Sequence, residues 1–189
     1  MAVPRDGVIL DLGANVGIFA LYAASRLAPA GKVYAFEPSP LCHAILLKNV
    51  TVNPQLNVIV SDAAVSDFDG PATLFDNGES LGASMFEESA QTYNIRTESL
   101  PTILAATGPL ALLKANIEGA EYRLLLNSPA ECWKIIDRVV IKYHEGGPAK
   151  GHHSSELSSR LTALGYRILR HEKIWDAPWG QTGIISAEH

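Results

Sequence analysis

Two acidic residues and the glycine-containing turn between them are the features of this sequence most suited to binding chemistry. Asp11 precedes a turn that contains Gly13, Asn15 and Gly17, and Glu37 follows a second apolar run. A turn that binds a diphosphate needs closely spaced glycines, and Asn15 stands where the middle glycine would be. The Asp11 carboxylate would repel a diphosphate but could suit a cation. The turn therefore favours a cationic ligand over a dinucleotide.

Glu37 supplies the second half of the predicted binding site. It ends the strand-like run from 32 to 36, where a carboxylate can accept hydrogen bonds from both hydroxyls of a ribose. An acid, a glycine turn and a second acid would together suit an adenosine that carries an amino acid and a positive sulfur. The alternative is a plain strand–helix turn with a surface glutamate, which is disfavoured because both features occur at strand ends.

A second group of polar residues follows two later apolar runs. Asn116 and Glu118 come after one run, and His144 ends the next. An imidazole titrates near neutral pH, so His144 could act as a general base toward an alcohol. A surface or loop-anchoring histidine is the alternative. Glu118 and Glu121 lie near a helix start, where the dipole favours acids, and Glu121 is expected only to cap or pair locally.

Strands and helices that alternate along the chain would position these residues. Apolar runs at 8–10, 32–36, 58–60, 110–115 and 138–143 are separated by helical patterns, which predicts a parallel sheet covered on both faces. The runs at 166–169 and 182–186 are expected to form a hairpin at one edge. In such sheets ligands bind beyond the carboxyl ends of the strands, where the strand order reverses.

The segment from Asp67 to Ser99 is less regular. It contains a short strand-like run, Ala72 to Phe75, and then a polar stretch, Asn77 to Ser84. We expect an insertion over the carboxyl edge of the sheet that forms part of the acceptor pocket, since such pockets are built from variable loops. No repeat or linker divides the chain, so one domain over 1–189 is expected.

Composition limits the kinds of partner. The 189 residues are 47% hydrophobic and 19% charged, with a net charge of −5, and they contain no dense basic run, which argues against binding nucleic acid. No apolar run approaches the roughly 20 residues that span a bilayer. Cys42 and Cys132 are expected to be buried free thiols, and with no signal peptide pattern at the start a cytoplasmic location is predicted.

Four stretches resemble the class I methyltransferases that use S-adenosyl-L-methionine, and more specifically the FkbM family of O-methyltransferases. They are 8–17, 35–38, 64–70 and 113–121, and the Ile-Glu-Gly-Ala-Glu run in the last is the most diagnostic. The resemblance implies an α/β fold with a doubly wound, mostly parallel seven-stranded sheet and an antiparallel final strand. It also implies methyl transfer to a hydroxyl of a small-molecule, natural-product or sugar acceptor.

The same resemblance assigns the site residues. The cofactor-binding residues would be Asp11, Gly13, Ala14, Asn15, Gly17, Glu37, Pro38, Asp62 and Ala63. Those of the turn would surround the methionine portion, Glu37 would hold the ribose, and Pro38 would border the adenine. Asp62 and Ala63 would face the adenine edge, with Asp62 accepting from its amino group. The catalytic residues would be Asn116, Glu118 and His144.

Three residues depart from the family pattern, in which acids are usual at these positions: Asn116, Lys142 and Pro101. Asparagine is a poorer ligand than carboxylate for a hard divalent cation, so dependence on a metal stays open. The sequence also lacks the N-terminal helices usual in the fold, so a homodimer partner or a neighbouring domain is expected to complete an open side.

Three alternative functions remain. A catalytically degenerate methyltransferase fold that serves as a binding module would agree with the three departures. An NAD-type Rossmann oxidoreductase is disfavoured by Asn15, and a nucleic-acid methyltransferase is disfavoured by the acidic charge and by the lack of its sequence motifs.

Overall fold

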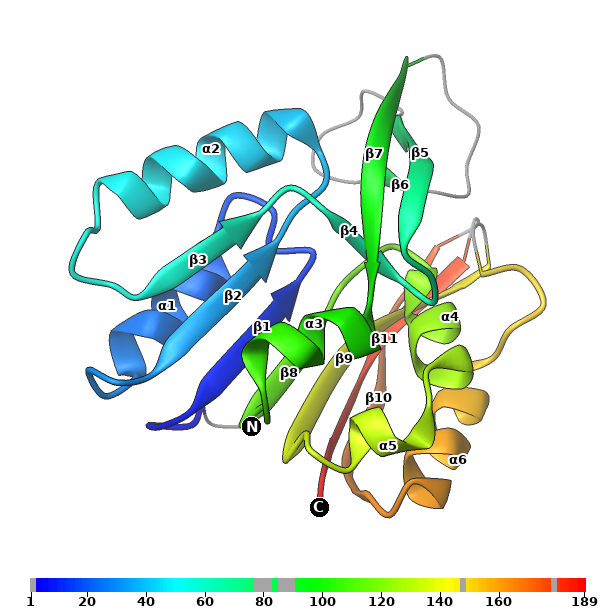
Figure 1. The fold of residues 1–189 in the computed structure, drawn as a ribbon. Coiled ribbons are helices and arrows are strands. Elements are labelled where there is room, and N and C mark those ends of the chain that lie inside the picture. The colour runs from blue at the N-terminus through cyan, green and yellow to red at the C-terminus, as the bar shows by residue number, and fades with distance from the viewer. Residues whose placement is uncertain (1–2, 77–82, 85–90, 147–148, 178–179) are drawn as a thin grey trace.

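Seven strands form the main sheet of the computed structural model, which describes residues 3–76, 83–84, 91–146, 149–177 and 180–189. The strand order is β10-β11-β9-β8-β1-β2-β3 (Figure 1). The strands are β1 (Val8–Leu12), β2 (Lys32–Phe36), β3 (Val58–Ser61), β8 (Leu112–Ala115), β9 (Arg138–Gly146), β10 (Arg167–Ala177) and β11 (Gly180–Glu188). All neighbours are parallel except β11, which is antiparallel to β9 and β10. The predicted sheet, its edge hairpin and its antiparallel final strand are confirmed.

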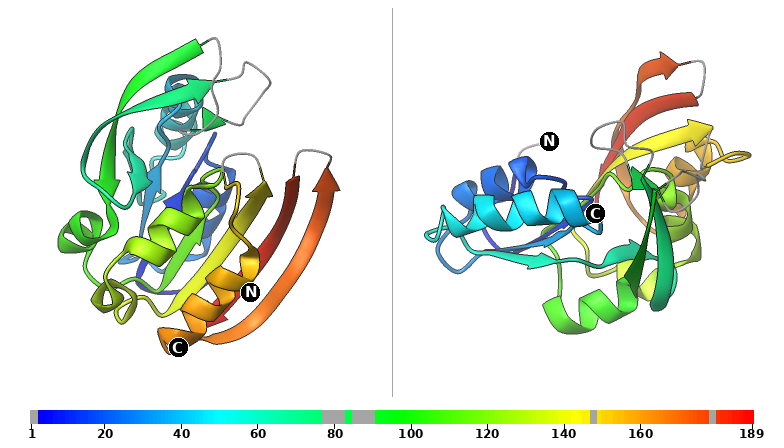
Figure 2. Two further views of the ribbon diagram at one scale, coloured as in Figure 1. Left: turned by 90° about the vertical axis from the view of Figure 1, so that its right-hand side faces the viewer. Right: turned by 90° about the horizontal axis from the view of Figure 1, so that it is seen from above.

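Helices cover both faces of this sheet (Figure 2). On one face lie α1 (Ile18–Arg26) and α2 (Pro40–Thr51), and on the other lie α3 (Leu100–Thr107), α4 (Ala120–Asn127), α5 (Ala130–Trp133) and α6 (Ser154–Ala163). Side chains alternate along a strand, so Ile9 of β1 packs with α1 and α2, while Leu10 and Leu12 pack in the opposite cluster. Both faces of the central strands are therefore buried, as their continuous apolar character predicts.

The strand order reverses at β1. The chain passes from β1 to β2 and β3 on one side, and it later returns to place β8 and β9 on the other side. The carboxyl ends of β1 and β8 consequently diverge into connections on opposite faces. This is the point at which open α/β sheets bind their ligands.

The irregular segment forms a second, four-stranded sheet in the order β4-β7-β5-β6. Its strands are β4 (Ala64–Ser66), β5 (Gly70–Asp76), β6 (Ala83–Ser84) and β7 (Gln91–Ser99), and they extend from the carboxyl edge of the main sheet (Figure 1). The sequence therefore predicted only one of these four strands, the run at 72–75, which lies within β5. Of the expected polar stretch at 77–84, residues 77–82 lie outside the described residues, and the last two form β6.

Asp69 anchors this second sheet to α3. Its carboxylate accepts hydrogen bonds from Ser99 N at 2.7 Å, Ser99 Oγ at 2.9 Å and Thr102 Oγ1 at 2.8 Å. Ser99 is the N-cap of α3, and Pro101 lies in its first turn, where proline is tolerated because the N–H would lack a helical partner. The structure thus gives Pro101 a local role in starting a helix that the sequence did not predict.

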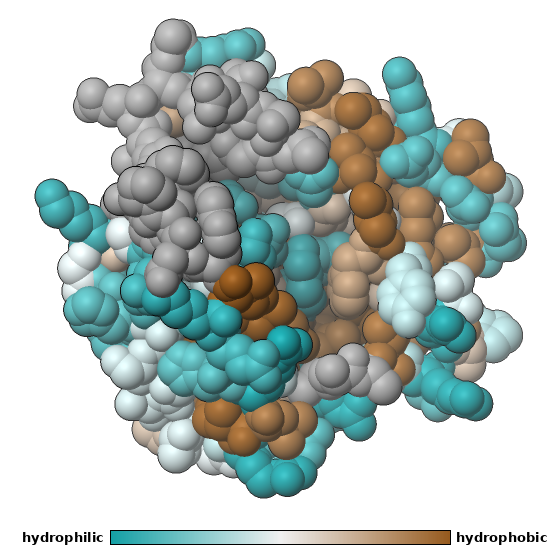
Figure 3. All heavy atoms as spheres, turned by 180° about the vertical axis from the view of Figure 1, so that it is seen from behind, coloured by the Kyte–Doolittle hydropathy of each residue, from teal (hydrophilic) through white to brown (hydrophobic). Residues whose placement is uncertain are grey.

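The outer surface of α1 and α2 carries several exposed apolar side chains. Seen from behind, they gather over these two helices (Figure 3) and include Ile18, Leu41 and Ile45. None of the helices in the described part of the chain is long and apolar enough to cross a membrane. Cys42 is buried as predicted, whereas Cys132 is only partly buried, and neither is part of a disulfide.

Candidate functional site

The glycine turn after β1 uses its own N–H groups internally. All five backbone N–H groups from 13 to 17 donate within the protein. Those of Gly13 and Ala14 donate to Phe36 O, and that of Gly17 donates to Ala14 O. The N–H of Asn15 donates to Glu37 Oε2, and that of Val16 donates to Asn15 Oδ1. A diphosphate is bound by backbone N–H groups that point away from the protein. This turn has none to offer, which supports the prediction that it is not a dinucleotide site.

Backbone conformation explains why Asn15 stands among glycines. Gly13, Asn15 and Gly17 have φ angles of 71°, 53° and 91°, all in the left-handed region. Asparagine tolerates this region better than most residues. At Gly13 a Cβ would lie 1.9 Å from the carbonyl oxygen of Asn116, so only glycine fits between the ends of β1 and β8.

Glu37 lies at the end of β2 and is 7% exposed. Its Oε2 accepts from Asn15 N at 2.7 Å and its Oε1 accepts from Ser39 N at 2.9 Å. Burial raises the pKa of this carboxyl above its usual value, although the two hydrogen bonds and the Lys114 ammonium act in the opposite direction. Since each carboxylate oxygen has two acceptor positions, Glu37 both holds the turn and keeps capacity for two further donors.

Asp11 forms an ion pair that the sequence interpretation overlooked. It lies opposite Lys114 in the β1–β8 pairing, is fully buried, and has its Oδ1 2.7 Å from Lys114 Nζ. Burial raises the pKa of Asp11, and Lys114 only partly offsets this. The ammonium also donates to the carbonyl oxygens of Gly13 at 2.8 Å and Leu12 at 3.3 Å. The sequence interpretation assigned Asp11 to a cationic ligand without this partner, and the structure adds Lys114 as a cation already beside it.

The residues expected near the adenine have different exposures. Pro38 is partly buried, and Ala63 is fully buried in the core. Asp62 follows β3, has a side chain 75% exposed, and lies 3.8 Å from the Arg96 guanidinium of β7. Of this group, Asp62 therefore has the side chain most open to a ligand, and Arg96 is a partner that the sequence interpretation did not include.

His144 lies between two carboxylates. Its Nδ1 is 3.2 Å from Glu121 Oε1, and its Nε2 is 3.4 Å from Glu118 Oε2. Glu121 also accepts from Ile117 N and Gly119 N, each at 2.7 Å, which confirms the expected local pairing. The sequence interpretation missed its contact with His144. The second acid of the Ile-Glu-Gly-Ala-Glu run was the available signal.

The two carboxylates govern the charge of His144. Burial alone lowers the pKa of this imidazole, but the hydrogen bond and charge of Glu121 and the charge of Glu118 outweigh it. Lys142 acts against the two acids, and the net effect is a pKa above the usual histidine value. His144 therefore stays protonated to a higher pH than an ordinary histidine and is a stronger base once neutral.

Asn116 places an open acceptor near the same edge. Its Oδ1 is buried, and no group among the described residues hydrogen-bonds to it. Across those residues, no three His, Cys, Asp or Glu side chains are grouped to hold a metal ion. A donor from a bound molecule would satisfy this oxygen.

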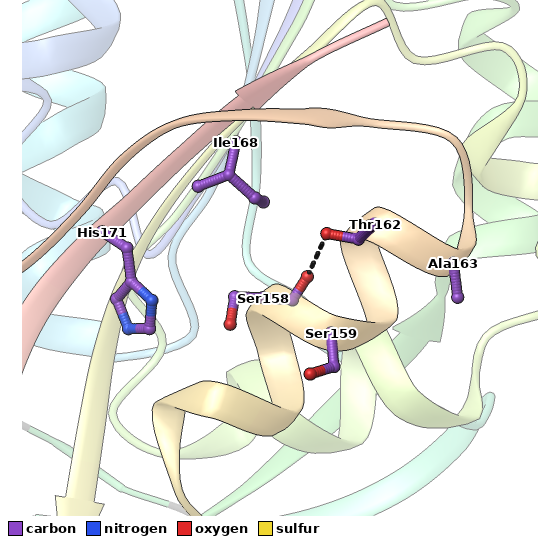
Figure 4. A pocket seen from close by; sticks show the side chains of 6 residues that line it. All are labelled: Ser158, Ser159, Thr162, Ala163, Ile168 and His171. Atoms are coloured by element: carbon purple, nitrogen blue, oxygen red, sulfur yellow. Dashed lines mark hydrogen bonds between the residues drawn. The ribbon is translucent and has the colours of Figure 1, made fainter.

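A shallow pocket lies apart from these residues. It has a volume of about 550 Å³ between α6 and β10, and is lined by Ser158, Ser159, Thr162, Ala163, Ile168 and His171 (Figure 4). Thr162 Oγ1 donates to the backbone oxygen of Ser158 there. None of the predicted site residues lines this pocket. The candidate site is instead formed by the residues that follow or end strands β1, β2, β8 and β9.

Comparison with known proteins gives consistent similarities. Residues 11–168 match the model of the methyltransferase FkbM domain. Methyltransferase sdnD of Sordaria araneosa is 26% identical, with 98% of this chain and 82% of that protein covered. The 31-O-demethyl-FK506 methyltransferase FkbM of Streptomyces tacrolimicus is 27% identical over 89% of this chain and 75% of its own. The crystal structure of methyltransferase FkbM from Methylobacillus flagellatus aligns with a TM-score of 0.58 and 14% identity, covering 98% of this chain and 44% of that one.

The buried ion pair yields a stability prediction. Lys114→Met removes the cation beside Asp11, and we expect the free energy of unfolding in urea to fall by about 3–5 kcal/mol at neutral pH. The loss should shrink at acidic pH, where Asp11 is protonated. Asp11→Asn combined with Lys114→Met should recover much of it.

The matched control is Lys134→Met. Lys134 lies 3.9 Å from Glu131, and both side chains are largely exposed, so the change should cost no more than about 1 kcal/mol. Equal stabilities for the Lys114 and Lys134 variants would contradict the assigned importance of the pair.

Proposed function

The chain belongs to the methyltransferase FkbM domain family of S-adenosyl-L-methionine-dependent methyltransferases, and from this premise we propose that it methylates a hydroxyl of a small-molecule, natural-product or sugar acceptor. The observation that carries the proposal is the partly buried imidazole of His144, held by Glu121 at the carboxyl edge of the sheet. An alcohol must lose its proton when it is methylated, so this reaction needs a base beside the acceptor.

The residues at the strand ends suit the cofactor. It carries no phosphate, and the turn from 13 to 17 has no N–H group directed at one. Glu37 retains acceptor positions for two ribose hydroxyls, and Asn116 Oδ1 is a further acceptor near the end of β8. These residues would hold the adenosyl and amino-acid portions. When bound, the cofactor supplies an electrophilic methyl group on a positively charged sulfur.

The protein's contribution to the reaction is alignment and proton removal. His144 Nε2 would take the proton of the acceptor hydroxyl, and the hydroxyl oxygen would gain the methyl group as the bond from methyl carbon to sulfur breaks, which leaves the sulfur neutral. The raised pKa of His144 strengthens this base, because a higher pKa favours proton transfer to the imidazole. Alignment of two bound reactants contributes on the order of 7–11 kcal/mol in well-oriented systems.

The nature of the acceptor is supported by one relative. The name of the Streptomyces tacrolimicus protein contains 31-O-demethyl-FK506, which denotes a compound that lacks a methyl group on one oxygen. A hydroxyl acceptor for this chain agrees with that name and with a base at His144. The second sheet beside the carboxyl edge is the part of the fold that we propose selects the acceptor.

Replacing the ribose-binding residue should weaken cofactor binding. Glu37→Gln keeps one acceptor oxygen but removes the charge, and we expect the affinity for S-adenosylhomocysteine to fall about 10- to 100-fold by calorimetry. Glu131→Gln, at an exposed position, should bind normally. Tight binding of NAD by the native protein, with none of S-adenosylhomocysteine, would instead favour the oxidoreductase alternative.

Replacing the proposed base should slow turnover without loss of cofactor binding. His144→Ala should lower methyl transfer to a hydroxyl acceptor, such as 31-O-demethyl-FK506 or a methyl glycoside, by about 10²- to 10⁴-fold. Its affinity for S-adenosylhomocysteine should stay within about twofold. In the native enzyme the rate should increase with pH through a pKa above the ordinary histidine value of about 6.5, because only the neutral imidazole is a base.

Undiminished turnover of His144→Ala would remove this residue from the mechanism. Cofactor binding by the native protein with no turnover on any hydroxyl acceptor would favour the catalytically degenerate binding module.

A further inference from the structure

We propose that Glu121 is the positioning residue of His144, and that its buried carboxylate fixes the imidazole with Nδ1 protonated and Nε2 available as the basic nitrogen. The direction of Nε2 toward an acceptor rests on the proposed function. The fixed tautomer depends only on the contacts between these two residues.

Glu121 is held rigidly. It is fully buried in the first turn of α4, and its two oxygens accept separately from Ile117 N and Gly119 N. Rotation of the carboxylate would break both hydrogen bonds and leave buried N–H groups without partners, which is costly. Its Oε1 is therefore a fixed point on the connection between β8 and α4.

The contact with this fixed oxygen determines the tautomer of His144. An ionised carboxylate only accepts hydrogen bonds, so the nitrogen 3.2 Å from Glu121 Oε1 must be the donor. Neutral imidazole has one N–H, and when it lies on Nδ1 the lone pair lies on Nε2. Glu121 thereby selects the form of His144 that can accept a proton at Nε2.

Glu118 acts differently because it is more exposed. Its side chain is 33% exposed, against 0% for Glu121, and its oxygen lies farther from the ring, at 3.4 Å from Nε2. This oxygen forms an ion pair with the imidazole when His144 is charged, but it would face the Nε2 lone pair when His144 is neutral. We therefore assign Glu118 to the charged state and Glu121 to both states. Lys142 also acts on this imidazole and opposes the two acids.

The test is nitrogen NMR of histidine-labelled protein, as the full chain without cofactor, over a pH titration. Neutral His144 in the native protein should show the Nδ1–H tautomer. Glu121→Gln should move the titration of His144 to lower pH and remove the tautomer preference, because the amide can accept or donate. Glu118→Gln should lower the titration point but retain the Nδ1–H tautomer.

The matched control is Glu156→Gln. Glu156 Oε2 lies 3.1 Å from His152 Nδ1, and both side chains are about 40% exposed. This pair therefore has the same carboxylate–imidazole contact as Glu121 and His144, but at an exposed position. This change should leave the titration and tautomer of His144 as they are in the native protein.

Three results separate the proposals. An Nε2–H tautomer in neutral native His144 overturns the role of Glu121, and this needs no variant to fold. A Glu121→Gln protein with an unchanged tautomer and titration also overturns it. If both NMR results agree with expectation but His144→Ala turns over normally, the positioning role holds and the proposed base is wrong.

The pH profile of turnover separates a positioning role of Glu121 from a purely structural one, because loss of structure alone would lower the rate without moving the profile. In Glu121→Gln, the pH at which turnover reaches half its plateau should move down, together with the NMR titration. If the NMR titration moves while the pH profile of turnover does not, the positioning role holds and His144 is not the base of the reaction. If neither moves, the positioning role is overturned.

Discussion

One buried ion pair, between Asp11 and Lys114, governs the arrangement of the candidate site. It joins β1 to β8 where the strand order reverses, and the same ammonium holds the carbonyl oxygen of Gly13. Removal of charges from water offsets much of the attraction in such a pair, so its net contribution to stability is limited. We infer that its main effect is to fix which residues of β1 and β8 lie opposite one another. The conformation of the glycine turn then follows.

The two halves of the site share one structural device, in which a buried glutamate holds the backbone of a strand–helix turn. Glu37 accepts from the turn after β1, and Glu121 accepts from the turn after β8. Each turn contains a non-glycine residue in the left-handed region, Asn15 in the first and Glu118 in the second. In both turns a buried carboxylate therefore stabilises a backbone that contains a left-handed residue, and Glu121 also contacts His144.

Several features could be predicted from the sequence because local pattern or family resemblance specified them. The central strands are continuous apolar runs, and the glycine turn and the Ile-Glu-Gly-Ala-Glu run have distinctive spacing. Strand β7 was missed because its residues are mostly polar, so it lacks an apolar signal. The Asp11–Lys114 pair was missed because it depends on strand register. The second role of Glu121 was missed because capping already explained an acid at a helix start.

The central claim is that the strand ends at β1 and β2 hold S-adenosyl-L-methionine through Glu37 and the adjoining turn. A crystal structure of the protein with S-adenosylhomocysteine tests it most directly. Both ribose hydroxyls should lie within hydrogen-bonding distance of the Glu37 carboxylate, with the homocysteine portion against the turn from 13 to 17. A ribose bound away from Glu37, or a ligand seated elsewhere on the molecule, would contradict it.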